Sequence, residues 1–527
     1  MSADIYKVGT IDAATVDRAA AALSSDDALA LARRIVGGEF SAVALLEACL
    51  SRIAAQDPRL GAVCLLAPDV GRAAARAVDA EVATAAGSVD RQQALLARRP
   101  FAGVPLLLKD LATAALGLPS GFGSVLYRRH TGGPVDWPVD AELVARYRAA
   151  GFVPFGRTTT PELGISASTE ARAYGRPTRN PWRAAFSAGG SSGGAGAAAA
   201  ARMVPLAHAT DGAGSIRIPA SCCGLVGFKP SRALMPTGPL YGEGWGGMAT
   251  EHVLTHSVRD CAVALAVSAG ADRGAGYPAP MFDAPAVRQI GSGDGPAGAP
   301  RLRIGLIETT FEGVAVDPRV RTAVRAVADT LAAAGHSVAP VSPGVGTVDV
   351  VETVIRTMAV WTAAGIDAFC ATHGLDPARL PEDVLEPGTR GAWRLGHATS
   401  GPAYVALLAR GNQLSRAIAA ATAGVDLPLM PTLAELPAAI GRFAMNNPDY
   451  LDYRLGPSGL IHYSPFTPLA NLTGRPAISL PLGEADGLPI GIQLVGEIGA
   501  DATLLRLAAE LEICLPWRER RPPEEVS

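Results

Sequence analysis

Two glycine-rich segments of the chain carry serines whose hydroxyls could act as nucleophiles. The first reads GGSSGGAG over residues 189–196, and the second reads DGAGS over residues 211–215. Glycine permits positive φ and close backbone approach, and such loops expose N–H groups toward an anion. A serine hydroxyl also needs a nearby base that takes its proton before it can attack. These loops therefore admit three interpretations: a phosphate cradle, ordinary flexible loops, or a nucleophilic site.

The spacing of the two loops favours a shared site. The chain contains no GxxxxGK[ST] string, and GGSSGGAG does not fit the GxGxxG spacing of a dinucleotide fingerprint. Either loop alone is better interpreted as an ordinary loop. However, Ser191 and Ser215 lie 24 residues apart, and a helix over 193–202 followed by a strand over 203–209 would return both to one end of a sheet. Lys109 follows the apolar run FAGVPLLL and could reach the same edge, where active sites of open α/β sheets lie.

The elements that must position these residues alternate between helix and strand. Apolar periodicity predicts two helices within 27–56 that are broken near Gly37–Gly38, and a mainly helical stretch over 342–424. The other predicted elements are strands at 101–108, 203–209, 302–308 and 336–341, helices at 318–335 and 501–514, and a helix followed by a strand within 139–156. This alternation predicts an α/β fold with a mixed, largely parallel sheet that is covered by helices.

Composition excludes several classes of protein. The chain has 527 residues, a net charge of −3 and 49% hydrophobic residues, so a disordered chain or a nucleic-acid binder with a basic stripe is not indicated. No stretch of 18 apolar residues lacks a charge, which argues against a membrane span. The first residues contain no apolar signal region, and the seven cysteines show no zinc spacing. We therefore expect a cytoplasmic protein with reduced, mostly buried thiols, no metal and no cofactor.

The two loops also carry a resemblance to a known family. GGSSGGAGAAAA, followed by DGAGSIRIPASCCGLVGFKPSRALMP, resembles the amidase signature family of serine amidohydrolases, and FAGVPLLLKDL, AAGFVPFGRTTTPELG and YSPFTPLANLTGRPAISLPLG support it. The resemblance runs from about residue 27 to Trp517 and is strongest over 100–240. It implies a large mixed central sheet with helices on both faces, in a single amidase signature domain over 1–527. Within that domain we expect a catalytic core (27–260) with the signature at 189–230, an irregular connection (271–300), a variable, mostly helical substrate region (342–465), and C-terminal strands and a helix (466–517).

The resemblance assigns a role to each reactive residue. Ser215 matches the nucleophile, Ser191 the bridging serine held by a cis peptide, and Lys109 the general base. Backbone N–H groups of the glycine loop match the oxyanion hole, at Gly212, Ala213, Gly214 and Ser215. A lysine that acts as a base must be neutral, which requires that burial lower its pKa. The position of Lys109 after an apolar strand suits that requirement.

Neighbouring residues have structural interpretations. We expect Ser192 to brace its loop, and Asp211 and Arg217 to form an ion pair that holds the nucleophile loop. Cys222–Cys223 is interpreted as a buried turn, Lys229 as a surface or loop contact, and the histidines as non-catalytic. Ala213 stands where the family commonly has glycine, and Arg157 where it commonly has lysine.

The substrate is expected to be a small or oligomeric, rather apolar amide. The signature resembles the branch that acts on the 6-aminohexanoate cyclic dimer, on aryl amides and on carbamates. The pocket is expected to draw on 120–137, 174–182, 240–250, 342–410 and 440–465, with candidate contacts at Tyr127, Trp137, Tyr174, Trp245, Trp361 and Asn446. For each of these side chains alone, ordinary packing is an equal alternative. A glutaminase-type amidotransferase subunit and a non-catalytic binding protein stay open, and a homodimer is the partner that the resemblance suggests, with no nucleic acid and no membrane.

Overall fold

The structure, a computed structural model, describes residues 12–130, 135–291, 300–310 and 312–523. The strands are β1 Val63–Leu66, β2 Pro105–Lys109, β3 Val153–Thr158, β4 Ala207–Asp211, β5 Val226–Lys229, β6 Thr250–Thr255, β7 Arg303–Leu306, β8 Ser337–Pro340, β9 Leu427–Pro431, β10 Ala477–Ala485 and β11 Leu488–Val495. The helices are α1 Ala13–Ser25, α2 Ala28–Val36, α3 Ala42–Leu60, α4 Pro68–Ala85, α5 Val89–Arg98, α6 Val125–His130, α7 Glu142–Ala149, α8 Gly193–Ala200, α9 Arg217–Cys223, α10 Val258–Ser268, α11 Ala284–Ile290, α12 Pro318–Ala333, α13 Thr347–Thr372, α14 Pro387–His397, α15 Gly401–Ala421, α16 Tyr450–Leu455, α17 Pro468–Thr473 and α18 Asp501–Cys514. Short 3₁₀ helices are η1 Glu162–Gly164, η2 Arg172–Tyr174, η3 Pro377–Arg379 and η4 Leu460–His462.

The strands form one mixed sheet, in the order β1-β3-β2-β4-β6-β5-β10-β11-β9-β7-β8. The parallel pairs are β2 with β3 and β4, and β7 with β8 and β9. The other six pairs are antiparallel, so the expectation of a largely parallel sheet is wrong. One reason is that β10 and β11 are joined by a two-residue turn in which Asp486 and Gly487 both have positive φ. Such a turn favours a hairpin rather than a helical crossover.

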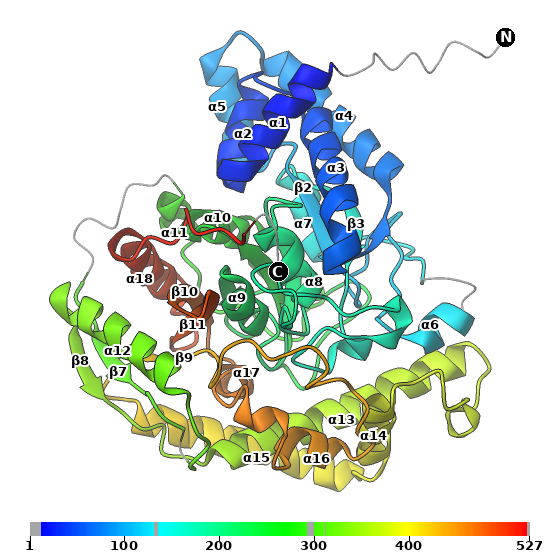
Figure 1. Ribbon diagram of the computed structural model, residues 1–527, viewed down its shortest axis with the longest axis vertical. Helices are drawn as coiled ribbons and strands as arrows, with labels where there is room; N and C mark the ends of the chain where they lie inside the picture. Colours follow the sequence, from blue (N-terminus) through cyan, green and yellow to red (C-terminus); the bar gives the residue numbers. More distant parts are fainter. Residues whose placement is uncertain (1–11, 131–134, 292–299, 311, 524–527) are drawn as a thin grey trace.

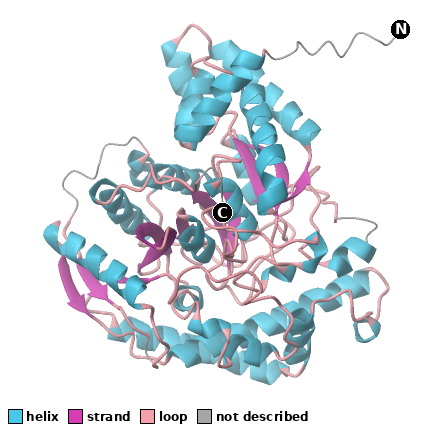
Figure 2. Cartoon of the chain, in the orientation of Figure 1, coloured by secondary structure: helices cyan, strands magenta, loops and turns pink. Residues whose placement is uncertain are grey.

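Helices cover both faces of this sheet, as the fold expectation requires (Figures 1 and 2). Side chains alternate between the faces of a strand, and β2 illustrates the consequence. Leu107 belongs to the hydrophobic core that includes residues of α3, α8 and α9, whereas Leu106 and Leu108 belong to the core that includes residues of α7, α10 and α18. The strand is buried on both faces, which explains its continuous apolar sequence.

Most of the long elements agree with the expectations. The broken helix pair is α2 and α3, and β7, α12 and β8 form the expected parallel βαβ unit. The short strands β1, β5, β6 and β9 were not expected, because runs of four to six residues carry little periodicity. The expected irregular connection 271–300 contains helix α11, and its residues 292–299 lie outside the described residues. Asp283 caps this helix by accepting a hydrogen bond from the Ala286 N–H.

Helix α13 is the one helix of the described residues that is long and apolar enough to cross a membrane. It spans 26 residues, and the window that passes this test has a mean hydropathy of 1.3 and is 56% buried inside the protein. It packs beside α14, α15 and α17 (Figure 1). A buried core helix has the same composition, so this helix alone is weak support for a membrane span.

Candidate active site

Lys109 occupies the carboxyl end of β2, on the same face as Leu107. Its side chain is fully buried, and its Nζ lies 2.7 Å from Oγ of Ser191, 2.9 Å from Oγ of Ser192 and 2.8 Å from Oγ1 of Thr210. The Ser192 hydroxyl donates to the Thr210 carbonyl oxygen, so Ser192 accepts from the amine. A neutral amine has two N–H donors and one lone pair. These three hydrogen-bonding positions equal the number of hydroxyls that surround Nζ. The neutral amine therefore keeps one lone pair, to which the hydroxyl of Ser191 or Thr210 can donate.

Burial also sets the protonation state of this lysine. Desolvation lowers the pKa of Lys109 to about 7, although the negative charges of Asp211 and Glu251 oppose the shift. Removal from water disfavours the charged ammonium. A substantial fraction of Lys109 is therefore neutral near pH 7, as a general base requires.

The first glycine-rich loop brings Ser191 to this amine. The peptide bond between Gly190 and Ser191 is cis, and helix α8 begins at Gly193. Ser192 is fully buried and also accepts a hydrogen bond from the Thr210 N–H. It therefore braces the loop against β4, as expected, and contacts Lys109 in addition.

The second loop carries Ser215 between β4 and α9. Strands β2 and β4 are parallel neighbours, so Lys109 and the loop after Asp211 lie at the same edge of the sheet. Ser215 and Ser191 line one large cavity, but the hydrogen bonds of the described residues include none between their hydroxyls. Catalytic hydrogen bonds often tighten only when substrate binds.

The backbone around Ser215 differs in one respect from the expected oxyanion hole. The Gly214 N–H donates to Oδ1 of Asp211 at 2.7 Å, so it is not free to bind an oxyanion. Gly214 has a φ of +126°, and a Cβ there would lie 2.3 Å from Oγ1 of Thr467. Only glycine fits this backbone conformation and this close contact. Among the described residues, the N–H groups of Gly212, Ala213 and Ser215 have no acceptor and remain the candidates.

Asp211 and Arg217 form the expected ion pair, with both side chains fully buried. Nε and Nη2 of Arg217 lie 2.9 and 3.0 Å from the two carboxylate oxygens. Burial alone would raise the pKa of Asp211, but the charge and hydrogen bonds of Arg217, with a hydrogen bond from Asn471, outweigh burial and hold it below its ordinary value. The carboxylate also accepts the N–H groups of Gly214 and Ile216. The pair therefore holds the shape of the nucleophile loop.

We expect Arg217→Met to destabilise the protein strongly. The substitution leaves the Asp211 carboxylate buried without its partner, which typically costs about 3–5 kcal/mol in the free energy of unfolding. Urea denaturation measures the change. Arg410→Met, which removes a half-exposed arginine paired with Asp349 on the surface, is the matched control and should leave the denaturation midpoint nearly unchanged. Equal midpoints for the two variants would show that the buried pair does not hold the loop.

The large cavity has a volume of about 1060 Å³ and opens in front of Ser191 and Ser215. Four of the six expected contact residues line it: Tyr127, Trp137, Trp245 and Trp361. Tyr174 does not line it, because its hydroxyl donates to Oδ2 of Asp110 at 2.7 Å. Asn446 does not line it either, because its side chain accepts a hydrogen bond from Arg172. Of the expected pocket segments, 174–182 contributes no lining residue, and 131–134 lie outside the described residues.

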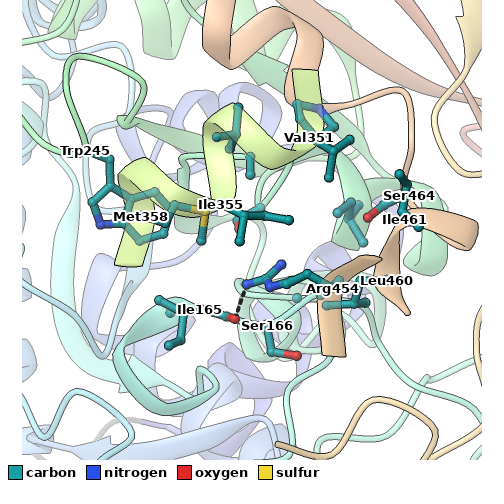
Figure 3. A pocket seen from close by; sticks show the side chains of 18 residues that line it. Ile165, Ser166, Trp245, Val351, Ile355, Met358, Arg454, Leu460, Ile461 and Ser464 are labelled. Atoms are coloured by element: carbon teal, nitrogen blue, oxygen red, sulfur yellow. Dashed lines mark hydrogen bonds between the residues drawn. The ribbon is translucent and has the colours of Figure 1, made fainter. Parts of the chain in front are cut away.

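A second, smaller pocket (Figure 3) shares Ser215 with the large cavity as a lining residue. Its volume is about 30 Å³, and its walls come from α13, α16, η4 and the segments 164–167 and 213–218. Trp245 has a φ of +52° and lines both cavities. A Cβ at Gly212 would lie 2.2 Å from the Trp245 ring. Glycine at position 212 therefore lets this ring pack against the nucleophile loop.

The other residues singled out from the sequence are structural. Lys229 is buried rather than on the surface, and its amine donates to the Pro230 carbonyl oxygen. Cys222 and Cys223 are buried, as expected, but they lie in helix α9 rather than in a turn. Nδ1 of His208 accepts the backbone N–H of Lys109, which supports the strand rather than the amine.

Thr210, which the sequence analysis missed, contacts the lysine amine. Its place immediately before DGAGS, at the end of a strand, was the signal that could have identified it.

The chain is similar over nearly its whole length to known proteins. A family model described as "Amidase" matches residues 44–505. The chain is 36% identical over 504 residues to the 6-aminohexanoate-cyclic-dimer hydrolase of Paenarthrobacter ureafaciens, covering 94% of this chain and 96% of that protein. A solved structure of 6-aminohexanoate cyclic dimer hydrolase is 34% identical, with a TM-score of 0.82 over 94% of this chain and 98% of its own. A bacterial aryl acylamidase of the amidase signature family is 26% identical, with a TM-score of 0.80 over 94% of this chain and 99% of its own.

Proposed function

This chain belongs to the amidase signature family and is an amidohydrolase, and from that premise we propose that it cleaves the C–N bond of small or oligomeric amides through an acyl-enzyme on Ser215. The substrates are linear, cyclic or aryl amides, with carbamates as a further class. The observation that carries the proposal is the set of short contacts between the buried Lys109 amine and the serine hydroxyls of the glycine loop.

The first half-reaction forms the acyl-enzyme. Ser215 Oγ attacks the amide carbonyl carbon while its proton passes to Ser191 Oγ, and the Ser191 proton passes to the neutral Lys109 amine. The carbonyl oxygen becomes an oxyanion, which the N–H groups of the nucleophile loop stabilise by about 3 kcal/mol per donor. When the C–N bond breaks, the proton returns through Ser191 to the leaving nitrogen. An amine departs and the acyl group stays on Ser215.

The second half-reaction releases the acid. A water molecule attacks the acyl carbon and gives its proton to Ser191, which again passes a proton to Lys109. The tetrahedral intermediate collapses, the ester C–O bond breaks, and Ser215 recovers its proton. The net reaction consumes one amide and one water and produces one amine and one carboxylic acid, without an external cofactor.

The proposal also covers where the enzyme is located and what it binds. All seven cysteines, which lie within the described residues, are free thiols, and five of them are buried, which supports the reducing cytoplasm as the location. The small-molecule amide is the proposed partner, and a homodimer is the proposed assembly. Neither nucleic acid nor a membrane takes part.

A substrate panel tests the proposed function. The purified chain is incubated with an alkyl amide, an anilide, the cyclic dimer of 6-aminohexanoate, an aryl carbamate and glutamine, and amine release is followed by chromatography. We expect hydrolysis of at least one of the first four without ATP or a partner protein. Activity on glutamine alone would instead identify an amidotransferase subunit, and no activity on any member would support a binding protein.

A further inference from the structure

The small pocket beside Ser215 contains a buried arginine. The pocket volume of about 30 Å³ corresponds to about two water molecules. Most of its walls are apolar, and they include Val351, Val354, Ile355 and Met358 of α13, together with Leu460 and Ile461. Figure 3 shows the Arg454 guanidinium reaching between Ile355 and Ser166 toward the middle of the pocket.

Arg454 is only partly satisfied by the protein. Its side chain is 8% exposed, and its Nη2 donates both to the Ile165 carbonyl oxygen and to the Tyr450 hydroxyl. Its Nε is buried without a hydrogen-bond partner, and Nη1 has no acceptor among the described residues. No carboxylate of the described residues forms an ion pair with it. The rings of Tyr450 and Tyr453 lie 5.0 and 5.6 Å from the guanidinium carbon, which offsets only part of the cost of burying a charge.

The residues that line each cavity indicate where each part of the substrate would lie. Ser191, which would return the proton to the leaving nitrogen, lines the large cavity and not the small pocket. The amine part of the substrate therefore belongs in the large cavity. Ser215 lines both cavities, whereas Ala213, whose N–H is a candidate oxyanion donor, lines only the small pocket. The acyl part, which stays on Ser215 after the amine leaves, therefore belongs there with Arg454.

We propose that Arg454 binds a carboxylate on the acyl part of the substrate, so that the preferred substrates are amides of short dicarboxylic acids. This inference rests on the proposed function, because it deepens the substrate class of the same site. The small pocket has room for little more than the carboxylate itself, so the one or two methylene groups of a malonyl or succinyl unit would lie between it and Ser215. The buried Nε–H, which has no partner in the protein, can donate a hydrogen bond to one carboxylate oxygen, and the carboxylate charge completes the pairing that the protein leaves open.

A pair of matched anilides tests the inference with the unmodified enzyme. In succinanilate the acyl chain ends in a carboxylate, and in 4-methylpentananilide an isopropyl group of similar shape replaces it. We expect kcat/KM to be higher for succinanilate by about 10-fold to 100-fold, as for a hydrogen-bonded charge pair. Equal or faster hydrolysis of the neutral anilide would overturn the inference while leaving the proposed function intact.

Variants of Arg454 assign the preference to this side chain. Arg454→Met should remove the preference, so that the two anilides are hydrolysed with similar kcat/KM, whereas Arg454→Lys should restore part of it. The matched control is Arg410→Met, which replaces a half-exposed arginine on α15 and should preserve the wild-type ratio. A Met variant that keeps the wild-type ratio would contradict the proposal.

A binding measurement separates this inference from the proposed function. Calorimetric titration with succinate, which would be the acid product, should show binding to the wild type and to Ser215→Ala. It should show weaker binding by about 10-fold or more to Arg454→Lys. Succinate binding without hydrolysis of any amide would contradict the proposed function and support the anion site. Hydrolysis of neutral amides without succinate binding would contradict the anion site alone. If Arg454→Met does not fold, the Lys variant and the wild-type anilide ratio decide the question.

Discussion

Ser215→Ala is expected to lower kcat for the best substrate of the panel by at least about 10⁴-fold, the scale typical of removing a serine nucleophile. The hydroxyl oxygen is the atom that forms the bond to the acyl carbon, and water cannot take its place in the same geometry. Ser215 is 8% exposed, and no hydrogen bond of its hydroxyl is found among the described residues. The melting temperature should therefore change little. Chromatographic detection of the amine product measures the loss.

A matched serine distinguishes loss of chemistry from damage to the fold. Ser415 lies on α15, where its hydroxyl donates to the Gly411 carbonyl oxygen, far along the chain from both loops. Ser415→Ala should keep wild-type kcat. In addition, intact-mass analysis of wild type quenched during turnover should reveal a covalent acyl adduct that is missing in Ser215→Ala. Full activity in Ser215→Ala would contradict the acyl-enzyme mechanism.

The sequence carried enough information to place the reactive groups in the fold. The apolar run before Lys109 is a strand buried on both faces, and its end puts the amine in a dry environment. The helix and strand between the two glycine loops return both loops to that edge, as predicted, although the strand is Ala207–Asp211 rather than 203–209. These features depend on short segments of chain, where an apolar run bounded by glycine-rich loops indicates the element.

Features that depend on contacts between distant segments were not predictable in the same way. Arg454 and Tyr450 sit one helical turn apart in a six-residue helix, and nothing in that segment shows that it approaches Ile165 across 289 residues of chain. Tyr174 was expected at the substrate, but its hydroxyl binds Asp110. In the nucleophile loop, the sequence pattern does not reveal that the Gly214 N–H donates to Asp211. Each of these contacts is decided by packing rather than by local pattern.

The second large effect is expected at Lys109. Lys109→Met removes the only amine that contacts Ser191 among the described residues, so nothing takes up the proton of the attacking hydroxyl. We expect kcat/KM to fall by about 10²-fold to 10⁴-fold, the range of general acid–base contributions. The loss is measured on the same substrate as for Ser215→Ala, with the melting temperature as the test of folding.

The pH dependence of the wild type should report the same group. Burial lowers the pKa of Lys109 to about 7, and only the neutral amine acts as a base. The rate should therefore rise with pH through about 7 and then level off, and at pH 5 it should be about 100-fold below that plateau. Because the folded pKa lies below the ordinary value, the unfolded chain binds more protons above pH 7. Stability therefore also rises with pH between about 7 and the ordinary lysine range.

A variant of a second buried lysine distinguishes the effect of pH on the reaction rate from its effect on stability. Burial likewise lowers the pKa of Lys229 to about 7, but the hydrogen bond of its amine goes to the Pro230 carbonyl oxygen and not to a serine of either loop. Lys229→Met should therefore reduce the rise of stability with pH while keeping the limb of the rate profile near pH 7. Lys109→Met should lose that limb together with most of the activity. The opposite outcome, in which the limb disappears with Lys229 and persists without Lys109, would make Lys229 the base and would contradict the relay through Ser191.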